Sequence, residues 1–465
     1  MNIKFCGANR EVTGSCHLIT LDNGYTILLD CGLYQGYDED YESFNKNWLF
    51  DPKSIDCVVL SHAHIDHTGR LPYLVKSGFK GNIFSTHATR SLCAIMLLDS
   101  ARIQEYDAEY KNKQAAKKGS KENFKPLYET KHVSETMNMF RSVGYNRWFN
   151  IHPEVEILYT DAGHILGSAS ITMKVNGKNV LGFTGDIGRP ERPILRDPQP
   201  MPEVDFLICE STYGDSDHVS KPIEDQLFLD IVQETCIENK GKLIIPAFSV
   251  GRTQDIVYIF DRLFNEGVLP KIPIYVDSPL AVNATQVYGS HPECYDDELN
   301  EYLLTDDDPF GFNTLKYVRD VEFSKSLNDK KEPCVIISAA GMANAGRIQH
   351  HIANNIENPK NTILLVGYAA PSTPAGILIS GAKQLKLFGN WLQVNAQVKR
   401  IDALSAHGDR HEMLAFLKNQ LTSLKGLYLV HGEYDTQLAW QAFLEERGFD
   451  NIHIPKLNDV YEINS

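Results

Sequence analysis

The sequence predicts an α/β protein that combines a layered domain with a second domain built on a parallel sheet. Two observations support this prediction. In the N-terminal half, short apolar strands such as DCVVL, NVLGFT and VDFLIC each run into a polar cluster. This is typical of layered α/β or αββα architectures, in which the loops at strand ends carry the chemistry. From about residue 211, near-continuous apolar strands alternate with amphipathic helices, which favours a parallel, doubly wound sheet.

The first local element that the sequence predicts is a β-hairpin at residues 16–30. The runs CHLITL and YTILLD are rich in β-forming residues, and Asp22-Asn23-Gly24 lies between them. Asn-Gly between two such runs is a strong signal for a tight turn. Farther along, GKLIIPAF, KIPIYVD and PCVIIS each lead into a helical segment, and NTILLVG leads into a loop rich in proline and glycine. We expect these four strands to form the parallel sheet.

Composition indicates a globular protein of the cell interior. The chain has 465 residues, enough for two or three domains, of which 43% are hydrophobic and 23% charged. The N-terminal stretch MNIKFCGANREVTGS lacks the apolar core of a signal peptide, and no apolar run reaches the ~18–20 residues of a membrane-spanning helix. Nine scattered cysteines form no CxxC pair, as expected for reduced, buried thiols. We therefore expect a cytoplasmic protein without membrane contact.

The charge balance restricts how the chain can bind nucleic acid. Its formal net charge is −15, which argues against a broad basic face that grips nucleic acid regardless of sequence. A narrow cleft whose positive charge comes from metal ions remains compatible with this balance.

The stretch SHAHIDH, residues 61–67, places three histidines and an aspartate directly after an apolar strand. Imidazoles and carboxylates are ligands that suit Zn²⁺, whereas a core has no use for so many ionisable rings. On a loop, positions 62 and 64 point the same way and can share one ion, while positions 66 and 67 turn toward a second. Two ions ~3.5–4 Å apart need a bridging carboxylate, for which Asp186 in TGD is the natural candidate.

These motifs resemble those of a known family, the β-CASP nuclease branch of the metallo-β-lactamase fold. HAHIDH is similar to the family signature HxHxDH. The resemblance extends in order through six further motif residues: Asp30 in LLDCG, His164 in GHILGSA, Asp186 in TGD, Glu210 in CESTYG, His407 in SAHGD and His431 in VHGE. It looks closest to the bacterial and archaeal relatives of the cleavage and polyadenylation nuclease subunit, and it covers nearly the whole chain.

The resemblance implies a split architecture. An αββα metallo-β-lactamase domain would comprise residues 1–210 and 396–465, and a parallel-sheet β-CASP domain, residues 211–395, would be inserted between its halves. The residue pattern agrees, because Glu210 and His407 lie almost two hundred positions apart although both belong with the metal motifs. The segment between them has its own strand–helix rhythm and none of the matched ligands.

The resemblance also implies a dinuclear zinc site and a mechanism. One zinc ion would be bound by His62, His64 and His164, the other by Asp66, His67 and His431, with Asp186 as the bridge. A hydroxide activated by the two ions would attack the phosphodiester. Catalytic roles are implied for Asp66, His407, Glu210 and Asp30: Asp30 orients ligands from behind, and His407, poised by Glu210, protonates the departing oxygen as the general acid.

The leading functional hypothesis is a zinc-dependent ribonuclease that cleaves single-stranded RNA endonucleolytically. One alternative is a DNA nuclease of the cross-link-repair type, but such relatives generally carry valine where this chain has His431. A second is a non-catalytic RNA-processing scaffold, although inactive partners in this family usually lose metal ligands. A third is a small-molecule hydrolase such as a lactamase or thioesterase, against which the inserted domain argues. RNA is the expected partner, and a homodimer is one option for the oligomeric state.

Contacts to the RNA are expected where strands turn into helices. Arg252 in SVGRTQ, Ser338 and Arg347 in SAAGMANAGR, and Ser405 are candidate phosphate ligands. Close packing of helix on sheet through the glycines is an equally good explanation of these motifs. A departure from the family pattern occurs in GYAAPSTPAG, where Ala369 replaces the usual Gln and Gly376 the usual Arg. His350 and His351 are expected on a solvent-facing helix with no functional role.

Overall fold

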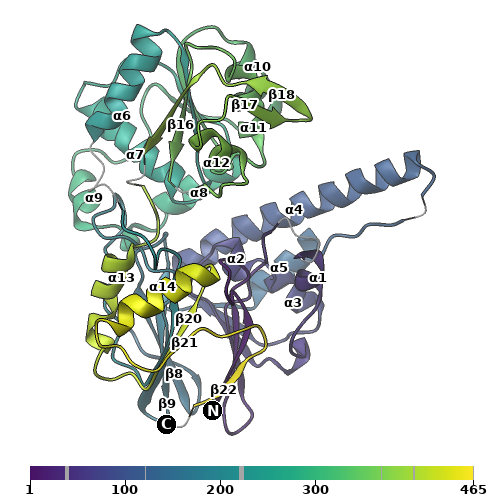
Figure 1. Ribbon diagram of the computed structural model, residues 1–465, viewed down its shortest axis with the longest axis vertical. Helices are drawn as coiled ribbons and strands as arrows, with labels where there is room; N and C mark the ends of the chain where they lie inside the picture. The colour runs from purple at the N-terminus through teal and green to yellow at the C-terminus, as the bar shows by residue number, and fades with distance from the viewer. Residues whose placement is uncertain (37–40, 121, 219–224, 368, 402–403, 464–465) are drawn as a thin grey trace. The chain divides into compact units, whose positions relative to one another are not determined.

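The chain folds into two compact units in the computed structural model (Figure 1). The structure describes residues 1–36, 41–120, 122–218, 225–367, 369–401 and 404–463. Unit 1 contains Met1–Pro190, Asp197–Asp217 and His407–Ser465. Unit 2 contains Glu191–Arg196 and His218–Ala406, so it interrupts unit 1 in the sequence.

Unit 1 is built on two sheets of seven strands each. The first sheet has the order β22 (Val460–Glu462), β1 (Asn2–Gly7), β2 (Cys16–Thr20), β3 (Thr26–Leu29), β4 (Cys57–Val59), β5 (Asn82–Ser85) and β6 (Phe140–Ser142). The second has the order β21 (Ile452–His453), β20 (Gly426–Val430), β11 (Phe206–Glu210), β10 (Lys178–Phe183), β9 (Ala169–Val175), β8 (Val155–Asp161) and β7 (Phe149–His152). The predicted hairpin is confirmed, because β2 and β3 pair antiparallel across the turn at Gly24, which has φ 87°.

The two sheets enclose one apolar core, and helices cover their outer faces (Figure 1). Side chains of both sheets, such as Ile27 and Ile157, meet in this core. On one side lie α1 (Tyr41–Lys46), α2 (Ile65–Thr68), α3 (Leu71–Lys76), α4 (His87–Lys117) and α5 (Thr130–Asn138). On the other lie α13 (Arg410–Leu417) and α14 (Tyr434–Glu445), whose Phe416 and Trp440 pack on the second sheet. The predicted αββα architecture is therefore confirmed.

Unit 2 contains a six-stranded sheet in which every pairing is parallel. Its order is β14 (Leu315–Tyr317), β13 (Ile274–Val276), β15 (Cys334–Ser338), β12 (Lys242–Pro246), β16 (Thr362–Val366) and β19 (Gln397–Ile401). The described α-helices of this unit are α6 (Asp225–Val232), α7 (Arg252–Asn265), α8 (Pro279–Gly289), α9 (Asp297–Tyr302), α10 (Val321–Asp329), α11 (Arg347–Asn355) and α12 (Pro374–Ile379). The predicted parallel sheet is confirmed. Strand β19, which the sequence analysis placed in the C-terminal part of the first domain, belongs to this sheet.

Two other features concern the cysteines and the hydropathy of the helices. All nine cysteines are buried free thiols. Among the helices that the structure describes, none is both long enough and apolar enough to cross a membrane.

Candidate metal centre

The candidate site in unit 1 is assembled from segments that follow strands at one edge of both sheets, including helix α2, which carries Asp66 and His67. In the first sheet β3 and β4 are parallel, and Asp30 and His62 follow their carboxyl ends. In the second sheet β10, β11 and β20 are parallel, so Asp186, Glu210 and His431 emerge at a common edge. The strand-end motifs of the sequence therefore meet in space.

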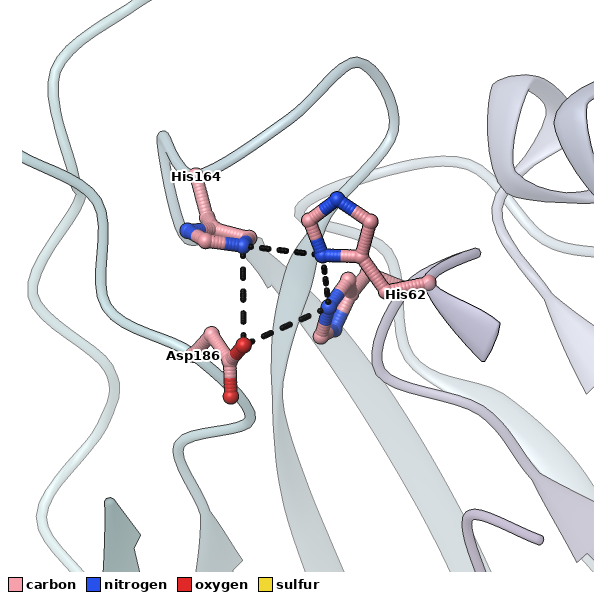
Figure 2. Close-up of side chains that lie close together, drawn as sticks. His62, His164 and Asp186 are labelled. Atoms are coloured by element: carbon pink, nitrogen blue, oxygen red, sulfur yellow. Dashed lines mark hydrogen bonds and ion pairs between the residues drawn. The ribbon is translucent and has the colours of Figure 1, made fainter. Parts of the chain in front are cut away.

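One group of possible metal ligands comprises His62, His64, His164 and Asp186 (Figure 2). Nδ1 of His64 lies 3.0 Å from Nε2 of His62 and 3.2 Å from Nε2 of His164. Oδ2 of Asp186 lies 3.4 Å from His62 Nε2 and 3.5 Å from His164 Nε2. Burial lowers the pKa of His64 to about 4 and that of His62 well below its usual value, so both imidazoles are neutral, the form that binds metals.

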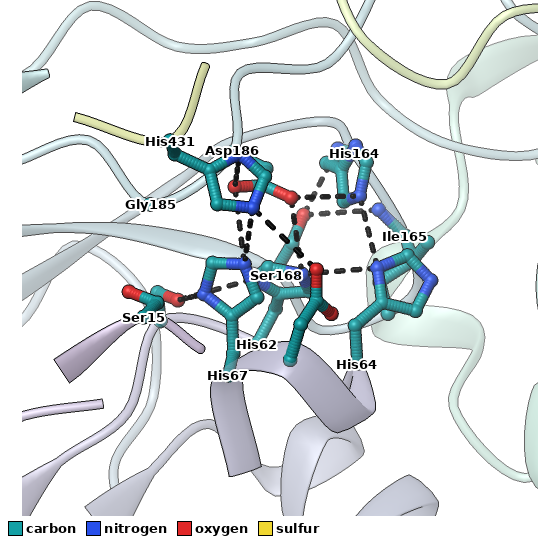
Figure 3. A network of polar contacts seen from close by, with 12 residues as sticks. Ser15, His62, His64, His67, His164, Ile165, Ser168, Gly185, Asp186 and His431 are labelled. Atoms are coloured by element: carbon teal, nitrogen blue, oxygen red, sulfur yellow. Dashed lines mark hydrogen bonds and ion pairs between the residues drawn. The ribbon is translucent and has the colours of Figure 1, made fainter. Parts of the chain in front are cut away.

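A second group comprises Asp66, His67 and His431; Figure 3 shows the two histidines of this group near Asp186. The Nε2 atoms of His67 and His431 are 3.3 Å apart. Oδ2 of Asp66 lies 3.5 Å from Nε2 of His431. Oδ1 of Asp186 lies 3.3 Å from His67 Nε2 and 3.6 Å from His431 Nδ1, so the Asp186 carboxylate faces both groups, one oxygen to each.

The donor set fits divalent metal ions. Asp186 is 2% exposed, and its Oδ1 has no hydrogen-bond partner among the described residues. A buried carboxylate oxygen left without a donor is costly, and a cation between it and the nearby imidazoles would remove that cost. Oxygen and imidazole nitrogen without thiolate form a ligand set that suits Zn²⁺.

Asp30 holds one of these histidines from behind. Its Oδ2 lies 2.7 Å from Nδ1 of His67. The Ser61 backbone N–H donates to Oδ1 and the Ser61 hydroxyl donates to Oδ2, both at 2.8 Å. Burial alone would lower the pKa of His67, but the carboxylates of Asp186 and Asp30 outweigh it and raise that pKa well above its usual value. Because Nδ1 of His67 is held by Asp30, Nε2 on the other side of the ring faces Asp186.

The backbone of the site adopts unusual conformations at two of these residues. Asp30 has φ 57° and His431 has φ 53°, values that side-chain-bearing residues seldom adopt and that cluster at functional sites. Close approach also demands glycine at position 188. A Cβ on Gly188 would stand 2.0 Å from the carbonyl oxygen of Gly163, next to His164.

His407 lies beside the two groups and contacts a different carboxylate. Its Nδ1 is 3.2 and 3.1 Å from the two oxygens of Glu210, and its Nε2 is 3.9 Å from Oδ2 of Asp186. Burial opposes protonation, but Glu210 and the nearby aspartates raise the pKa of His407 to about 9. Glu210 is in turn fixed by the backbone N–H of Ile187. This imidazole can therefore carry a proton next to the ligand groups.

Sequence reasoning missed three hydroxyl residues that support the site. Ser61 links Asp30 to the first histidine, since its Oγ also lies 3.0 Å from Nδ1 of His62. Ser168 accepts the backbone N–H of His164 at 2.9 Å, and Oγ1 of Thr212 lies 3.1 Å from Nδ1 of His431. Each of these residues lies inside one of the motifs that carry the candidate ligands. Their place in those motifs could have predicted their supporting role.

The expected phosphate ligands lie in unit 2, and two of them bond to other groups of that unit. Arg347 donates to Asp277 Oδ1 at 2.6 Å and to the carbonyl of Arg319 at 2.8 Å, and the Ser338 hydroxyl donates to the carbonyl of Asp277 at 2.7 Å. These internal bonds hold both polar groups in place; the Arg347 side chain is still 21% exposed, and contact of the two residues with RNA stays a prediction.

Two further phosphate candidates are also buried. Arg252 is 6% exposed and lies 3.5 Å from Oδ2 of Asp255, which also pairs with Arg192 at 2.8 Å. Ser405 is 5% exposed. The charge of Arg252 is therefore balanced inside the unit by Asp255, and phosphate binding by Arg252 and Ser405 stays a prediction.

His351 and Gly376 of unit 2 both lie in tightly packed surroundings. His351 was expected to face solvent, but it is 1% exposed and its Nε2 lies 2.6 Å from Oδ2 of Asp277. At Gly376 a Cβ would stand 2.2 Å from the carbonyl of Ala370, so this backbone leaves no room for the arginine usual in the family. Tyr368, at the start of the same stretch, lies outside the described residues.

The αββα layers and the ligand groups define the class: a metal-dependent hydrolase of the metallo-β-lactamase type. Comparison with family models agrees. Residues 9–94 match the metallo-beta-lactamase superfamily, 253–378 the Beta-Casp domain, and 391–455 the Zn-dependent metallo-hydrolase RNA specificity domain. The chain belongs to the β-CASP family of RNA-processing nucleases within that superfamily.

Individual relatives place the chain within that family. Ribonuclease TTHA0252 of Thermus thermophilus is 33% identical across 96% of this chain and 97% of its own. Transcription termination factor FttA of Methanosarcina mazei is 30% identical across 93% of this chain and 67% of its own. A crystal structure of a protein of unknown function from Enterococcus faecalis V583 shares the fold, with a TM-score of 0.55 over 99% of both chains at 11% identity.

Proposed function

We propose that this chain is a zinc-dependent ribonuclease that hydrolyses phosphodiester bonds within single-stranded RNA. The observation that supports it most is the position of Asp186. Its Oδ2 faces His62 and His164, and its Oδ1 faces His67 and His431. One carboxylate shared by two clusters of imidazoles suits a dinuclear hydrolytic site.

The chain offers a complete ligand set for two ions. His62, His64, His164 and Asp186 would hold one zinc ion; Asp66, His67, His431 and Asp186 would hold the other. When bound, zinc supplies Lewis acidity toward a phosphate oxygen and a water of strongly lowered pKa. Asp30 orients His67 by accepting its Nδ1–H, and this fixes which nitrogen faces the metal.

His407 would act as the general acid. Cleavage of a phosphodiester leaves an alkoxide on the departing ribose, which needs a proton. The carboxylate of Glu210 keeps the His407 imidazole protonated and oriented, and Nε2 points toward the ligand groups. Glu210 is a positioning residue, because it acts through the imidazole.

RNA is favoured over DNA because one of the similar proteins is named a ribonuclease and because the RNA specificity domain model matches residues 391–455. Endonucleolytic cleavage is the finer part of the proposal. Circular single-stranded RNA tests both parts, since only an endonuclease can open a circle. We expect the zinc-loaded protein to linearise circular RNA, to leave circular single-stranded DNA intact and to lose activity with a chelator.

Each part of this proposal can fail separately. Cleavage of linear RNA with the circle left intact would replace the endonuclease with an exonuclease. Cleavage of circular DNA alone would overturn the RNA assignment. A zinc-loaded protein that binds RNA and cleaves neither substrate would be a scaffold.

A further inference from the structure

A small hairpin of unit 2 presents an unusual surface. Strands β17 (Gln384–Leu387) and β18 (Asn390–Gln393) pair antiparallel and form a two-stranded sheet of their own; they lie close to α11 (Figure 1). Leu385 and Leu387 point inward, 1% and 3% exposed, and join the core of the unit. Because side chains alternate along a strand, the opposite face, which we call the hairpin face, consists of Gln384, Lys386, Trp391 and Gln393. All four are exposed.

Two large aromatic rings at this hairpin are open to solvent. The Trp391 indole is 65% exposed and lies directly opposite Lys386, whose Nζ is 5.9 Å from the ring centroid. Phe388 is 55% exposed and stacks on His350 of α11, with centroids 4.5 Å apart and planes at 21°. Flat rings held by neighbours and free on one side form a platform for another planar group.

The turn of the hairpin adopts a strained conformation that places an aromatic ring at the tip. Phe388 has φ 50° and is followed by Gly389 with φ 81°. Two central residues with positive φ define the type I′ turn, where asparagine or aspartate normally takes the first place. A bulky residue in this conformation is destabilising, and the Phe388 ring nevertheless remains at the surface.

The charge around the hairpin suits an anionic partner. Residues 380–401 contain Lys383, Lys386, Lys399 and Arg400 and no aspartate or glutamate, although the whole chain carries −15. Lys399 pairs with Glu234, and Glu357 accepts the backbone N–H of Gln393 at the hairpin edge. Lys383 and Lys386 are exposed and have no ion pair among the described residues. An anion that also has planar rings matches this combination.

We propose that the hairpin face binds single-stranded RNA outside the metal centre, with a base stacked on Trp391. Lys386 and Lys383 would contact the flanking phosphates, and the amides of Gln384 and Gln393 the edge of the base. Stacking of bases on exposed aromatics, combined with cationic contacts to the backbone, is how proteins hold single strands with little sequence preference. The choice of RNA as the strand rests on the proposed ribonuclease function.

Binding to the full-length protein in chelator, where cleavage is blocked, tests this directly. With oligoadenylate we expect quenching of tryptophan fluorescence in the parent and much less quenching in Trp391→Phe, which keeps a stacking ring but lacks the indole. Trp391→Ala should weaken binding roughly 10- to 100-fold, the usual value of one stacked base. Lys386→Gln should weaken binding and reduce its salt dependence.

Matched controls isolate the face. Leu304→Ala removes another exposed apolar side chain of unit 2, 86% exposed, and Lys316→Gln removes an exposed charge; neither should change RNA affinity. Unchanged affinity in Trp391→Ala would overturn the proposal, as would concentration-dependent self-association of the parent that Trp391→Ala abolishes. Cleavage assays on the zinc-loaded parent separate the two proposals. If the parent cleaves RNA and Trp391→Ala binds RNA as tightly as the parent, only the hairpin site is wrong. If RNA quenches the fluorescence of Trp391 but the parent does not cleave RNA, only the ribonuclease function is wrong.

Discussion

Oδ2 of Asp30 lies 2.7 Å from Nδ1 of His67, and both side chains are almost completely buried. Asp30→Asn replaces an acceptor with an amide that cannot hold the imidazole in the same way. We expect metal affinity to fall roughly 10- to 100-fold, as is usual when a partner behind a ligand is lost. Competition with a chromophoric chelator measures this. Unchanged affinity would show that Asp30 is only a turn residue.

Asp186→Ala should be more damaging than any single histidine change, because both metal positions lose a ligand together. Metal analysis of the purified variant should show loss at both positions. Its comparison is His431→Ala, which should weaken one ion and spare the position formed by His62, His64 and His164. His453→Ala changes a half-buried histidine of the same unit that belongs to neither ligand group; it is the control and should retain full metal. Full metal in Asp186→Ala would place the bridge elsewhere.

His407→Ala should separate proton donation from metal binding. We expect full zinc content, RNA affinity like that of the parent, and cleavage slower by roughly 10²–10⁴-fold. A phosphorothiolate substrate, whose leaving group needs no proton, should recover much of the lost rate. His411→Ala, a more exposed neighbour, should behave like the parent. Zinc loss would make His407 a ligand, and failure of the rescue would assign the proton to another group.

Glu210→Gln should move the pH dependence of cleavage. A general acid works only when protonated, so activity is present below its pKa and is lost as the pH rises through it. Glu210 contributes to raising the pKa of His407 to about 9. Without that carboxylate the alkaline limb of kcat should shift to lower pH, while zinc content stays the same. An alkaline limb at the parental position would exclude this coupling.

Asp277→Asn should destabilise unit 2. The Asp277 carboxylate is completely buried and is bound by Arg347, His351 and Ser324. Removing one partner of a buried ion pair typically costs about 3–5 kcal/mol. Chemical denaturation measures the loss, and Asp307→Asn, an exposed acidic residue of the same unit, is the control. A loss within the control's error would show that this network contributes little.

Asp277 also makes the stability of unit 2 depend on pH. Burial would raise its pKa, but bonds from His351, Ser324 and Arg347 outweigh this and hold the pKa below its usual value. The stabilisation is therefore complete above the unfolded value of about 3.9. It is lost as the pH falls through the lower folded-state pKa. Acid unfolding monitored in the parent and in Asp277→Asn should show this difference, and identical acid limbs would contradict it.

The ligand groups could be predicted from sequence because each ligand stands within a recognisable motif that follows a strand; Asp66 and His67 lie on the short helix α2 after β4. The parallel sheet of unit 2 was likewise visible in its apolar runs. The ion pair of Arg347 could not be predicted, because its partner Asp277 lies 70 positions away in the sequence. The burial of His351 could not be predicted for the same reason, because its partner Asp277 lies 74 positions away. The predicted domain boundary at residue 396 put β19 in the wrong domain. Its pairing with β16 joins it to the sheet of unit 2, and the local sequence pattern does not reveal that partner.

Titration of zinc into the metal-free protein, with RNA cleavage measured at each step, tests the dinuclear ribonuclease most directly. If Asp186 joins two metal positions, cleavage should rise to its maximum as about two zinc ions bind each chain, and Asp186→Ala should gain no activity over the same range. Full cleavage after one bound zinc ion, or in the absence of zinc, would contradict the shared role of Asp186 and the mechanism built on it.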